Sequence, residues 1–294
     1  MKNLVSISDL NKDFIYQLFD QADAMKARYV RGEVYKPLAG KTIITSFPPT
    51  SIRTRVTFET GVFQLGAQPL NLHMKFDDVE FVEDKIGHLN CWIDGLIIRH
   101  GSQDLIRRIA DLAEFPVING MTKDSHPCEI LSDLHGIREI RPDLESLKFV
   151  FVGEGANISN TWFEIAAKLD LNITQVCPIG YEINQELYDY AKSNSKGEVR
   201  ITHDLTEGLK NADIVLTDGW PPEIEELTKF MPYQLSIDKL KSANKGCLVN
   251  PCPPINRAHA VPTEVMDSEY FIGYEMKSSL LHMQKAILEE FMAR

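Results

Sequence analysis

Two stretches separated by three residues, Lys41-Thr-Ile-Ile-Thr-Ser-Phe47 and Ser51-Ile-Arg-Thr-Arg-Val-Thr-Phe-Glu59, lead from an apolar run to a polar turn and then to a helix-like pattern. The apolar run has the length and composition of a short buried strand, predicted over 42–47. The residues from Val56 to Leu65 predict a helix. Its apolar residues expected to be buried are Phe58, Val62, Phe63 and Leu65. A strand, a polar turn and a helix in this order form the repeating unit of an α/β fold.

The polar turn concentrates hydroxyl and guanidinium groups at the predicted start of this helix. It contains Ser51, Arg53, Thr54, Arg55 and Thr57. Hydroxyls, backbone N–H groups and guanidinium forks at a helix N-terminus make a site for a phosphate-sized anion. The alternative is an ordinary helix start, at which Ser and Thr cap the helix and the arginines point to solvent. The turn alone leaves both interpretations open.

Composition narrows the class of protein. The chain has 294 residues, of which 44% are hydrophobic and 25% charged, as in a soluble globular protein of one or, more typically, two domains. A net charge of −11 argues against broad nucleic-acid binding. No apolar run approaches the roughly 20 residues of a membrane helix, and the N-terminus lacks the pattern of a signal peptide. We therefore expect neither nucleic acid nor a membrane as a partner.

The cysteines and histidines bear on compartment and cofactors. Five scattered cysteines, an odd number, indicate reduced thiols and a cytoplasmic protein. The histidines show no metal-ligand spacing. We expect no metal and no cofactor.

Strands and helices alternate through the first half of the chain. A helix is predicted over 8–31 with Ser8 as its cap, strands over 93–98 and 115–118, and a helix from His126 to about Ile140. Each predicted strand ends in polar residues. In such sheets the ligand site lies beyond the carboxyl ends of the strands.

A second alternating series follows the break at Arg141-Pro142-Asp143. Strands are predicted over 147–152, 172–176, 212–216 and 246–249, with helices over 161–169 and 278–293. The predicted fold class is α/β, with two Rossmann-like domains that each hold a parallel sheet, over 1–140 and 141–277. The closing helix, 278–294, is expected to pack back on the first domain.

Polar residues follow five of these strands. They are Ser51, Arg53, Thr54 and Arg55, then Arg99 and His100, Asn157, Asp218, and Cys252 with Arg257. Loops are polar in any protein, but a common position at strand ends favours one ligand site.

Two other chemistries fit less well. A dinucleotide site at Gly153-x-Gly155 would need a third glycine where Ile158 stands. Cys252 has no histidine close in sequence, so a lining role is favoured over that of a nucleophile.

Several segments match, in order, the motifs of one enzyme family. They are Ser51–Glu59, His126–Asp133, Thr217–Trp220, Phe230–Gln234, Pro251–Arg257 and Leu281–Lys285. Together these segments, which span nearly the whole chain, resemble the aspartate/ornithine carbamoyltransferases and are more similar to the ornithine branch. The resemblance implies transfer of a carbamoyl group from carbamoyl phosphate to the amino group of an amino acid, without metal or organic cofactor, by a homotrimer. It also implies that the first domain binds carbamoyl phosphate and the second binds the amino acid.

The resemblance implies a role for each strand-end residue. Catalysis would involve Arg99 and His126, which would polarise the carbonyl group, and Cys252, which would lie beside the reacting amine. The implied carbamoyl-phosphate ligands are Ser51, Arg53, Thr54, Arg55, Glu129 and Arg257. Asn157 and Asp218, with Cys252, would bind the acceptor. These residue types suit the task, because the reaction needs cations on the leaving phosphate and donors to the carbonyl oxygen.

The chain also departs from the family motifs. Ile52 lies inside the phosphate loop, Glu129 replaces a glutamine, and Pro251 replaces a histidine. Leu280 replaces a phosphate-contacting arginine, for which Lys277 could substitute. The segment His73–Glu80 is short and carries Asp77 and Asp78, and Pro221-Pro222 stands where the loop that closes over ornithine would begin.

These departures keep three hypotheses open. The first is a carbamoyltransferase acting on ornithine or an ornithine-like acceptor. The second is an aspartate carbamoyltransferase, because Pro251–Arg257 is also similar to that branch. The third is a non-catalytic homologue that binds an anionic metabolite or a partner protein, since Glu129 and Leu280 are expected if phosphate binding were relaxed.

Overall fold

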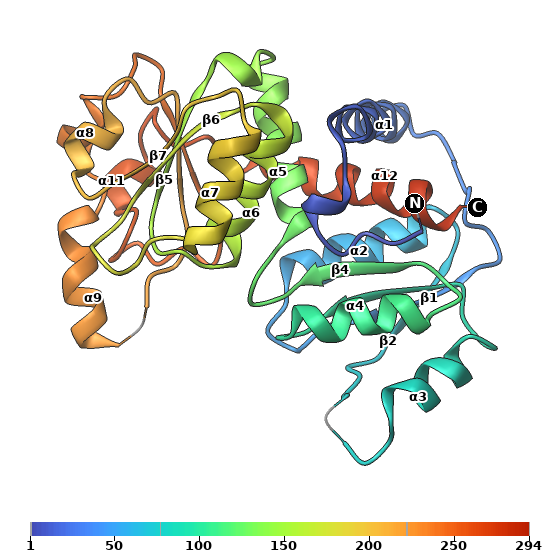
Figure 1. The fold of residues 1–294 in the computed structure, drawn as a ribbon. Helices are drawn as coiled ribbons and strands as arrows, with labels where there is room; N and C mark the ends of the chain where they lie inside the picture. Colours follow the sequence, from blue (N-terminus) through green and yellow to red (C-terminus); the bar gives the residue numbers. More distant parts are fainter. Residues whose placement is uncertain (1, 77, 222, 294) are drawn as a thin grey trace. The chain divides into compact units, whose positions relative to one another are not determined.

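The computed structural model describes residues 2–76, 78–221 and 223–293, so Asp77 and Pro222 lie outside the described residues. The chain divides into two compact units, one formed by Met1–Ile140 with Glu275–Arg294 and the other by Arg141–Tyr274 (Figure 1). Each unit has its own parallel sheet with helices packed around it.

The sheet of the first unit has four parallel strands in the order β2-β1-β3-β4. Its strands are β1 (Thr42–Ser46), β2 (Gln68–Asn71), β3 (Gly95–Arg99) and β4 (Val117–Met121). The inner strands β1 and β3 each bury four of their five residues, as expected of parallel strands covered on both faces. All four carboxyl ends therefore lie at one edge of this sheet.

Six α-helices and two 3₁₀ turns complete the described part of the first unit. They are η1 (Ile7–Asp9), α1 (Lys12–Val30), α2 (Arg53–Gln64), α3 (Val82–Leu89), α4 (Gln103–Leu112), α5 (Pro127–Ile140), η4 (Glu275–Ser278) and α12 (Ser279–Met292). The C-terminal helix α12 packs against α1, α2 and α5 (red in Figure 1). This confirms the prediction that the closing helix returns to the first half of the chain.

The sheet of the second unit has five parallel strands in the order β7-β6-β5-β8-β9. The strands are β5 (Lys148–Val152), β6 (Asn172–Val176), β7 (Val199–Thr202), β8 (Ile214–Thr217) and β9 (Leu248–Pro251). The helices are η2 (Leu144–Ser146), α6 (Asn157–Leu169), α7 (Gln185–Asn194), α8 (Leu205–Leu209), α9 (Ile224–Phe230), η3 (Met231–Tyr233), α10 (Ile237–Leu240) and α11 (Thr263–Met266). Two α/β units with wholly parallel sheets confirm the predicted fold class.

Three helix starts differ from the prediction. Helix α1 begins at Lys12 behind the cap Asn11, whose side chain accepts from the backbone of Phe14, because Ser6 and Ser8 belong to a separate 3₁₀ turn. Helices α2 and α6 begin three and four residues earlier than expected, at Arg53 and Asn157. Their first turns are mostly polar, although Thr54, Asn157 and Ser159 are buried, so they leave no apolar periodicity in the sequence.

Phe63 contradicts the predicted core. Its side chain is 73% exposed, whereas Phe58, Val62 and Leu65 are fully buried. The buried residues of α2 include Phe58, Gly61 and Val62, and Phe63 lies outside that buried face. Among the described residues no helix has both the length and the apolar character that crossing a membrane requires.

Candidate active site

The first unit brings Ser51 and Arg99 together at the carboxyl edge of its sheet. Strands β1 and β3 are parallel neighbours, so the residues that follow β1 meet those that end β3. The Arg99 Nη1 group donates to Ser51 Oγ at 3.4 Å, and Ser51 is 3% exposed. A hydroxyl and a guanidinium 48 residues apart in sequence thus share one location.

Helix α2 begins at this edge with its first turn lined by Arg53, Thr54 and Arg55. Ile52, at the N-cap position, makes no side-chain capping hydrogen bond, so the N–H groups of the first turn have no side-chain cap from it. Arg53 is exposed and Thr54 is buried. Uncapped N–H groups at a helix N-terminus, together with a guanidinium, form an anion-binding arrangement.

Arg55 differs from Arg53 in its partner. Its Nε donates to Glu59 Oε1 at 2.9 Å, one turn along the same helix. Arg55 is therefore tied to α2 by a charge-balanced pair, and Arg53 is the arginine of the turn for which the structure gives no comparable ion pair among the described residues.

His126 lies immediately before α5 and is 5% exposed. Burial lowers the pKa of His126 to about 4; Glu129 opposes this shift, while Arg99 and Lys277 add to it. Its imidazole is therefore neutral at pH 7. A neutral imidazole offers one donor and one acceptor nitrogen without adding charge to the site.

Glu129, one turn along α5, is balanced by a lysine from near the C-terminus. Lys277 Nζ lies 3.1 Å from Glu129 Oε1 and 2.6 Å from Asp133 Oδ1, and both carboxylates are buried. Burial alone would raise the pKa of Glu129, but the charge of Lys277 above all, with that of Arg53, holds it below its ordinary value. The charge that Glu129 brings to the site is thus met by an ammonium group.

A cavity of about 580 Å³, the strand-edge cavity, opens where these strands end. Its lining includes Arg99, His100, His73, Lys75 and Lys123. It is large enough for a small ligand and rich in cationic and imidazole groups. His73 and Lys123 were not predicted. Lys123 follows the end of β4 at Met121. The sequence prediction ended this strand at residue 118, so Lys123 was not counted among the residues that follow a strand.

Asp78, one of the acidic residues of the segment His73–Glu80, is already paired. Asp78 lines the strand-edge cavity, and Lys85 Nζ lies 2.6 Å from its Oδ1. Its negative charge is therefore compensated by a lysine of the following helix, α3.

The second unit places Asn157, Asp218 and Cys252 after three neighbouring strands, β5, β8 and β9. Asn157 Oδ1 accepts from the backbone N–H of Ile158 at 2.9 Å, and Asp218 Oδ1 accepts from that of Gly219 at 2.7 Å. These bonds fix the two side chains at the carboxyl edge of the sheet.

Asp218 and Cys252 line one small cavity of about 20 Å³ together with Trp220. The backbone N–H of Cys252 donates to Thr217 O at 2.7 Å, which holds β9 beside β8 at this end. Trp220 Nε1 is buried and has no hydrogen-bond partner among the described residues. The indole N–H of Trp220 can therefore donate to a ligand. The sequence motif Thr217–Trp220 did not indicate this role for the tryptophan.

Arg257 is exposed and pairs within the second unit. Its Nη1 lies 3.2 Å from Asp267 Oδ1, and its Nη2 donates to the hydroxyl of Tyr274 at 3.3 Å. The Tyr274 hydroxyl, with Asp267, raises the pKa of Arg257.

One group of described residues has metal-ligand types in reach of one another: Asp23, His135 and Glu139. The His135 ring contacts Asp23 Oδ1 at 2.9 Å and Ser279 Oγ at 3.2 Å, and the Arg138 guanidinium also faces Asp23. The group is an ion-pair cluster between α1 and α5 rather than part of the strand edge.

Comparisons with known proteins cover the whole chain. Residues 2–139 match the family described as aspartate/ornithine carbamoyltransferase, carbamoyl-P binding domain, and residues 145–291 match the corresponding Asp/Orn binding domain. The chain is 36% identical to an ornithine carbamoyltransferase of Syntrophus aciditrophicus over 98% of each chain. It is 33% identical to that of Oceanobacillus iheyensis, over 99% of this chain and 94% of the relative.

Solved structures of ornithine carbamoyltransferases share the fold of this chain. An ornithine carbamoyltransferase from Pyrococcus furiosus superposes with a TM-score of 0.95 at 29% identity, over 99% of this chain and 97% of that one. The enzyme from Gloeobacter violaceus gives a TM-score of 0.89 at 31% identity, over 99% of both chains. With both domain families matched and the fold shared from end to end, the chain belongs to the aspartate/ornithine carbamoyltransferase family.

Proposed function

We propose that this protein transfers the carbamoyl group of carbamoyl phosphate to the side-chain amine of ornithine. The observation that carries the proposal is the contact between Arg99 and Ser51 beside the uncapped N-terminus of α2. That arrangement offers a phosphate-sized anion a guanidinium, a hydroxyl and backbone N–H groups at one place.

The donor half of the reaction is assigned to the first unit. Arg53, Thr54 and the backbone of the turn hold the phosphate group, and Arg55 supports the turn through Glu59. Arg99 and the neutral His126 donate to the carbonyl oxygen, where negative charge develops as the amine attacks. Removing one such donor typically costs about 2.7–4 kcal/mol of transition-state stabilisation.

The acceptor half is assigned to the second unit. Asn157 and Asp218 bind the α-amino end of the amino acid, and Cys252 lies beside the reacting amine. The amine nitrogen forms a bond to the carbonyl carbon, the bond from that carbon to the phosphate oxygen breaks, and the proton of the amine passes to the departing phosphate. Glu129 accepts a hydrogen bond from the carbamoyl NH₂ group while Lys277 balances its charge. Arg257 completes the carbamoyl-phosphate ligands of the proposal.

Ornithine is favoured over aspartate as the acceptor. The relatives cited above are named ornithine carbamoyltransferases, and the Phe230–Gln234 segment resembles that branch. Asp218 also favours an acceptor that carries an additional amino group. The Glu129–Lys277 ion pair counts against a homologue that has lost its anion site, because the negative charge there is compensated.

We also propose a homotrimer in the cytoplasm. Exposed apolar side chains on α2 and β2 support self-association: Val56 is 55% exposed, Leu70 39% and Leu72 49%. The two elements are neighbours, because Asn71 donates to Glu59. All five cysteines are free thiols, as expected in a reducing compartment.

The test is phosphate release from carbamoyl phosphate in the presence of ornithine or aspartate, combined with thermal unfolding. Carbamoyl phosphate at 100 times its dissociation constant should stabilise the protein by about 2.7 kcal/mol and raise its unfolding midpoint. Arg53→Ala should abolish the rise, whereas Arg31→Ala, which changes an arginine paired with Glu33 outside the site, should preserve it. Phosphate release with ornithine alone supports the proposal, and release with aspartate alone supports the aspartate alternative. If phosphate is not released and millimolar ligand does not raise the unfolding midpoint, both carbamoyltransferase hypotheses fail and the non-catalytic hypothesis remains.

A further inference from the structure

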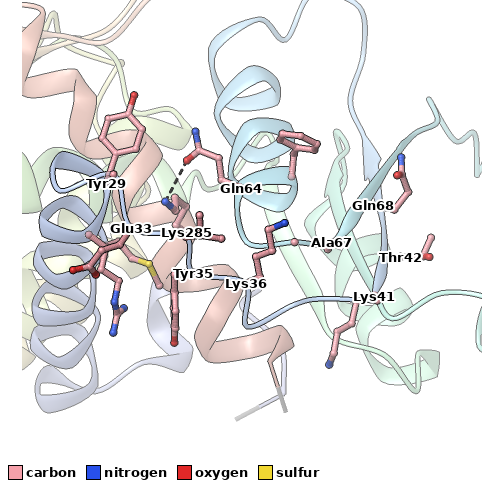
Figure 2. Close-up of a pocket in the computed structure, with 17 residues that line it drawn as sticks. Tyr29, Glu33, Tyr35, Lys36, Lys41, Thr42, Gln64, Ala67, Gln68 and Lys285 are labelled. Carbon is pink, nitrogen blue, oxygen red and sulfur yellow. Dashed lines mark hydrogen bonds between the residues drawn. The ribbon is translucent and has the colours of Figure 1, made fainter.

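The first unit holds a second cavity that the proposed reaction does not use. This α12 cavity, of about 570 Å³, is lined by residues of α1, of the segments 32–42 and 63–68, and by Lys285 of α12 (Figure 2). It shares no lining residue with the strand-edge cavity. A ligand bound here would therefore leave the candidate active site open.

Lys285 is the central feature of this cavity. The residue is 7% exposed, and its Nζ donates to Gln64 Oε1 at 3.2 Å (dashed line in Figure 2). The ring of Tyr29 lies 5.8 Å from Nζ. No carboxylate among the described residues forms an ion pair with it, so its partners are an amide and an aromatic ring. A buried ammonium group without a counter-charge is costly, and an anion in the cavity would remove that cost.

The stem of Lys285 is fixed by close helix packing. A Cβ atom added at Gly61 of α2 would lie 3.2 Å from Lys285 Cγ, so the absence of a side chain there lets α12 approach. The ammonium group then emerges one turn further along α2, at Gln64. Its position is thus set by the packing of two helices.

Two more cations of the cavity are also held in place. Lys36 packs its stem on Gly66, whose backbone has a φ of +93°, and a Cβ there would lie 2.8 Å from Lys36 Cβ. Figure 2 shows Lys36 extending toward the end of α2 that carries Gln64. The Arg28 guanidinium lies 4.0 Å from the centre of the Tyr35 ring. These contacts pre-organise positive charge around the cavity.

The charge of the lining is strongly one-sided. Four basic residues line the cavity against one acidic residue; they are Arg28, Lys36, Lys41 and Lys285, with Glu33 as the acid. Glu33 Oε1 is itself paired with Arg31 Nε at 2.6 Å. In a chain of net charge −11, this concentration of cations is a local exception that would attract anions.

From this geometry we infer that the α12 cavity binds a small organic molecule carrying at least two negative charges as phosphoryl or carboxylate groups. The anionic groups contact Lys285, Lys36 and Arg28. The exposed faces of Tyr29 and Phe63 contact the apolar part of the ligand. This inference does not depend on the proposed carbamoyl transfer.

The test is isothermal titration of the full-length protein with inorganic pyrophosphate and, separately, with citrate. The titrations use an Arg53→Ala background, which removes anion binding by the candidate active site. The background protein should bind one equivalent of at least one probe, more weakly as salt is raised. Adding Lys285→Met should weaken that binding at least about tenfold, as expected for loss of a hydrogen-bonded charge. The preferred probe identifies a phosphoryl or a carboxylate ligand.

Two further variants guard against misfolding and against non-specific charge effects. Lys36→Met changes an exposed side chain and should weaken binding several-fold without unfolding the protein. Lys196→Met removes a lysine 89% exposed on the second unit and should leave binding unchanged. The inference is overturned if the Arg53→Ala protein binds neither probe. It is also overturned if Lys36→Met and Lys285→Met bind as well as the background, or if Lys196→Met weakens binding equally.

Discussion

At the scale of single residues, Glu129 and Lys277 explain how the chain tolerates its departure from the family motif. A carboxylate about 4 Å from an anionic substrate would repel it by on the order of 4 kcal/mol at an effective dielectric of 20. Lys277 contacts both Glu129 and Asp133, so one ammonium group faces two buried carboxylates. The remaining negative charge is met by the cations that lower the pKa of Glu129, Arg53 among them.

Removing Lys277 should therefore affect both folding and substrate binding. We expect Lys277→Met to lower the free energy of unfolding by about 3 kcal/mol, the lower end of the range for a broken buried ion pair, because Lys277 is partly exposed. The KM for carbamoyl phosphate should rise at least about tenfold. Urea unfolding and steady-state kinetics measure the two effects.

The double variant Lys277→Met/Glu129→Gln separates charge from packing. Because it removes one of the two carboxylates that faced Lys277 and leaves Asp133, it should recover most of the loss in KM but only part of the loss in stability. If the double variant is as impaired as Lys277→Met alone, the ion pair does not act through the charge of Glu129.

His126 gives the protein a defined sensitivity to acid. The pKa of His126 is about 4 in the folded protein, against 6.5 for the ordinary side chain. Below pH 6.5 the unfolded chain therefore binds a proton that the folded chain does not, and stability falls as pH is lowered. The loss attributable to His126 between pH 7 and pH 5 should be about 2 kcal/mol.

Comparison of variants isolates this contribution. Urea unfolding of His126→Asn at pH 7 and pH 5 should show a loss about 2 kcal/mol smaller than that of the unmodified protein. His88→Asn changes an exposed histidine of the same unit and serves as the control. An identical pH dependence in all three proteins would contradict the buried, neutral state of His126.

At the scale of elements, the position of Lys277 depends on how η4 packs on α5. A Cβ atom added at Gly136 of α5 would lie 2.6 Å from Met276 Sδ and 3.0 Å from Met276 O, so part of the obstacle is backbone. Met276 immediately precedes Lys277. The glycine thus lets η4 approach α5 closely enough for Lys277 to reach Glu129 and Asp133.

Gly136→Ala should consequently destabilise the protein by about 1–3 kcal/mol through overpacking, although alanine favours a helix. It should also raise the KM for carbamoyl phosphate by displacing Lys277. The matched control is Gly87→Ala in α3, where an added Cβ would meet nothing within 4 Å. This substitution should stabilise the protein by about 0.5–1 kcal/mol. Calorimetry and kinetics on the two variants check the prediction. Equal effects of both substitutions would refute the packing argument.

The elements predicted correctly from sequence are those with a continuous buried face. Strands β1, β5 and β6 each bury four of their five residues, and their positions were predicted to within about a residue of the ends observed. The edge strands β2 and β7 were missed. Gln68–Asn71 contains a proline and is mostly exposed, and Val199–Thr202 is half-buried, so neither leaves an apolar run. Pairing with the neighbouring strand, rather than burial of its own side chains, makes each of them a strand.

Some residues of the candidate site could be predicted from the sequence because they follow buried strands. Strand ends led to Arg99, Asp218 and Cys252, because parallel strands bring their carboxyl ends to one edge of a sheet. The contact of Lys277 with Glu129 joins residues 148 positions apart, and no local pattern encodes the distance between them. The roles assigned to these residues remain predictions.

At the scale of the whole molecule, self-association is the remaining prediction. Val56 on α2 and Leu72 after β2 are exposed apolar side chains on neighbouring elements, and burial of such surface is what drives stable association. Light scattering should give a mass of about 100 kDa, for three chains of 33.4 kDa each.

Substitution of the exposed apolar side chains should dissociate this trimer. Val56→Lys/Leu72→Lys places charge where an apolar contact is expected, so the mass should shift toward that of a single chain at micromolar concentration. Ile179→Lys changes a side chain 79% exposed on the second unit and should leave the mass unchanged. A monomeric unmodified protein would contradict the trimer itself. If the double variant remains a trimer, the interface does not include these side chains of α2 and the end of β2. Two lysines buried in an apolar contact would cost more free energy than the contact contributes.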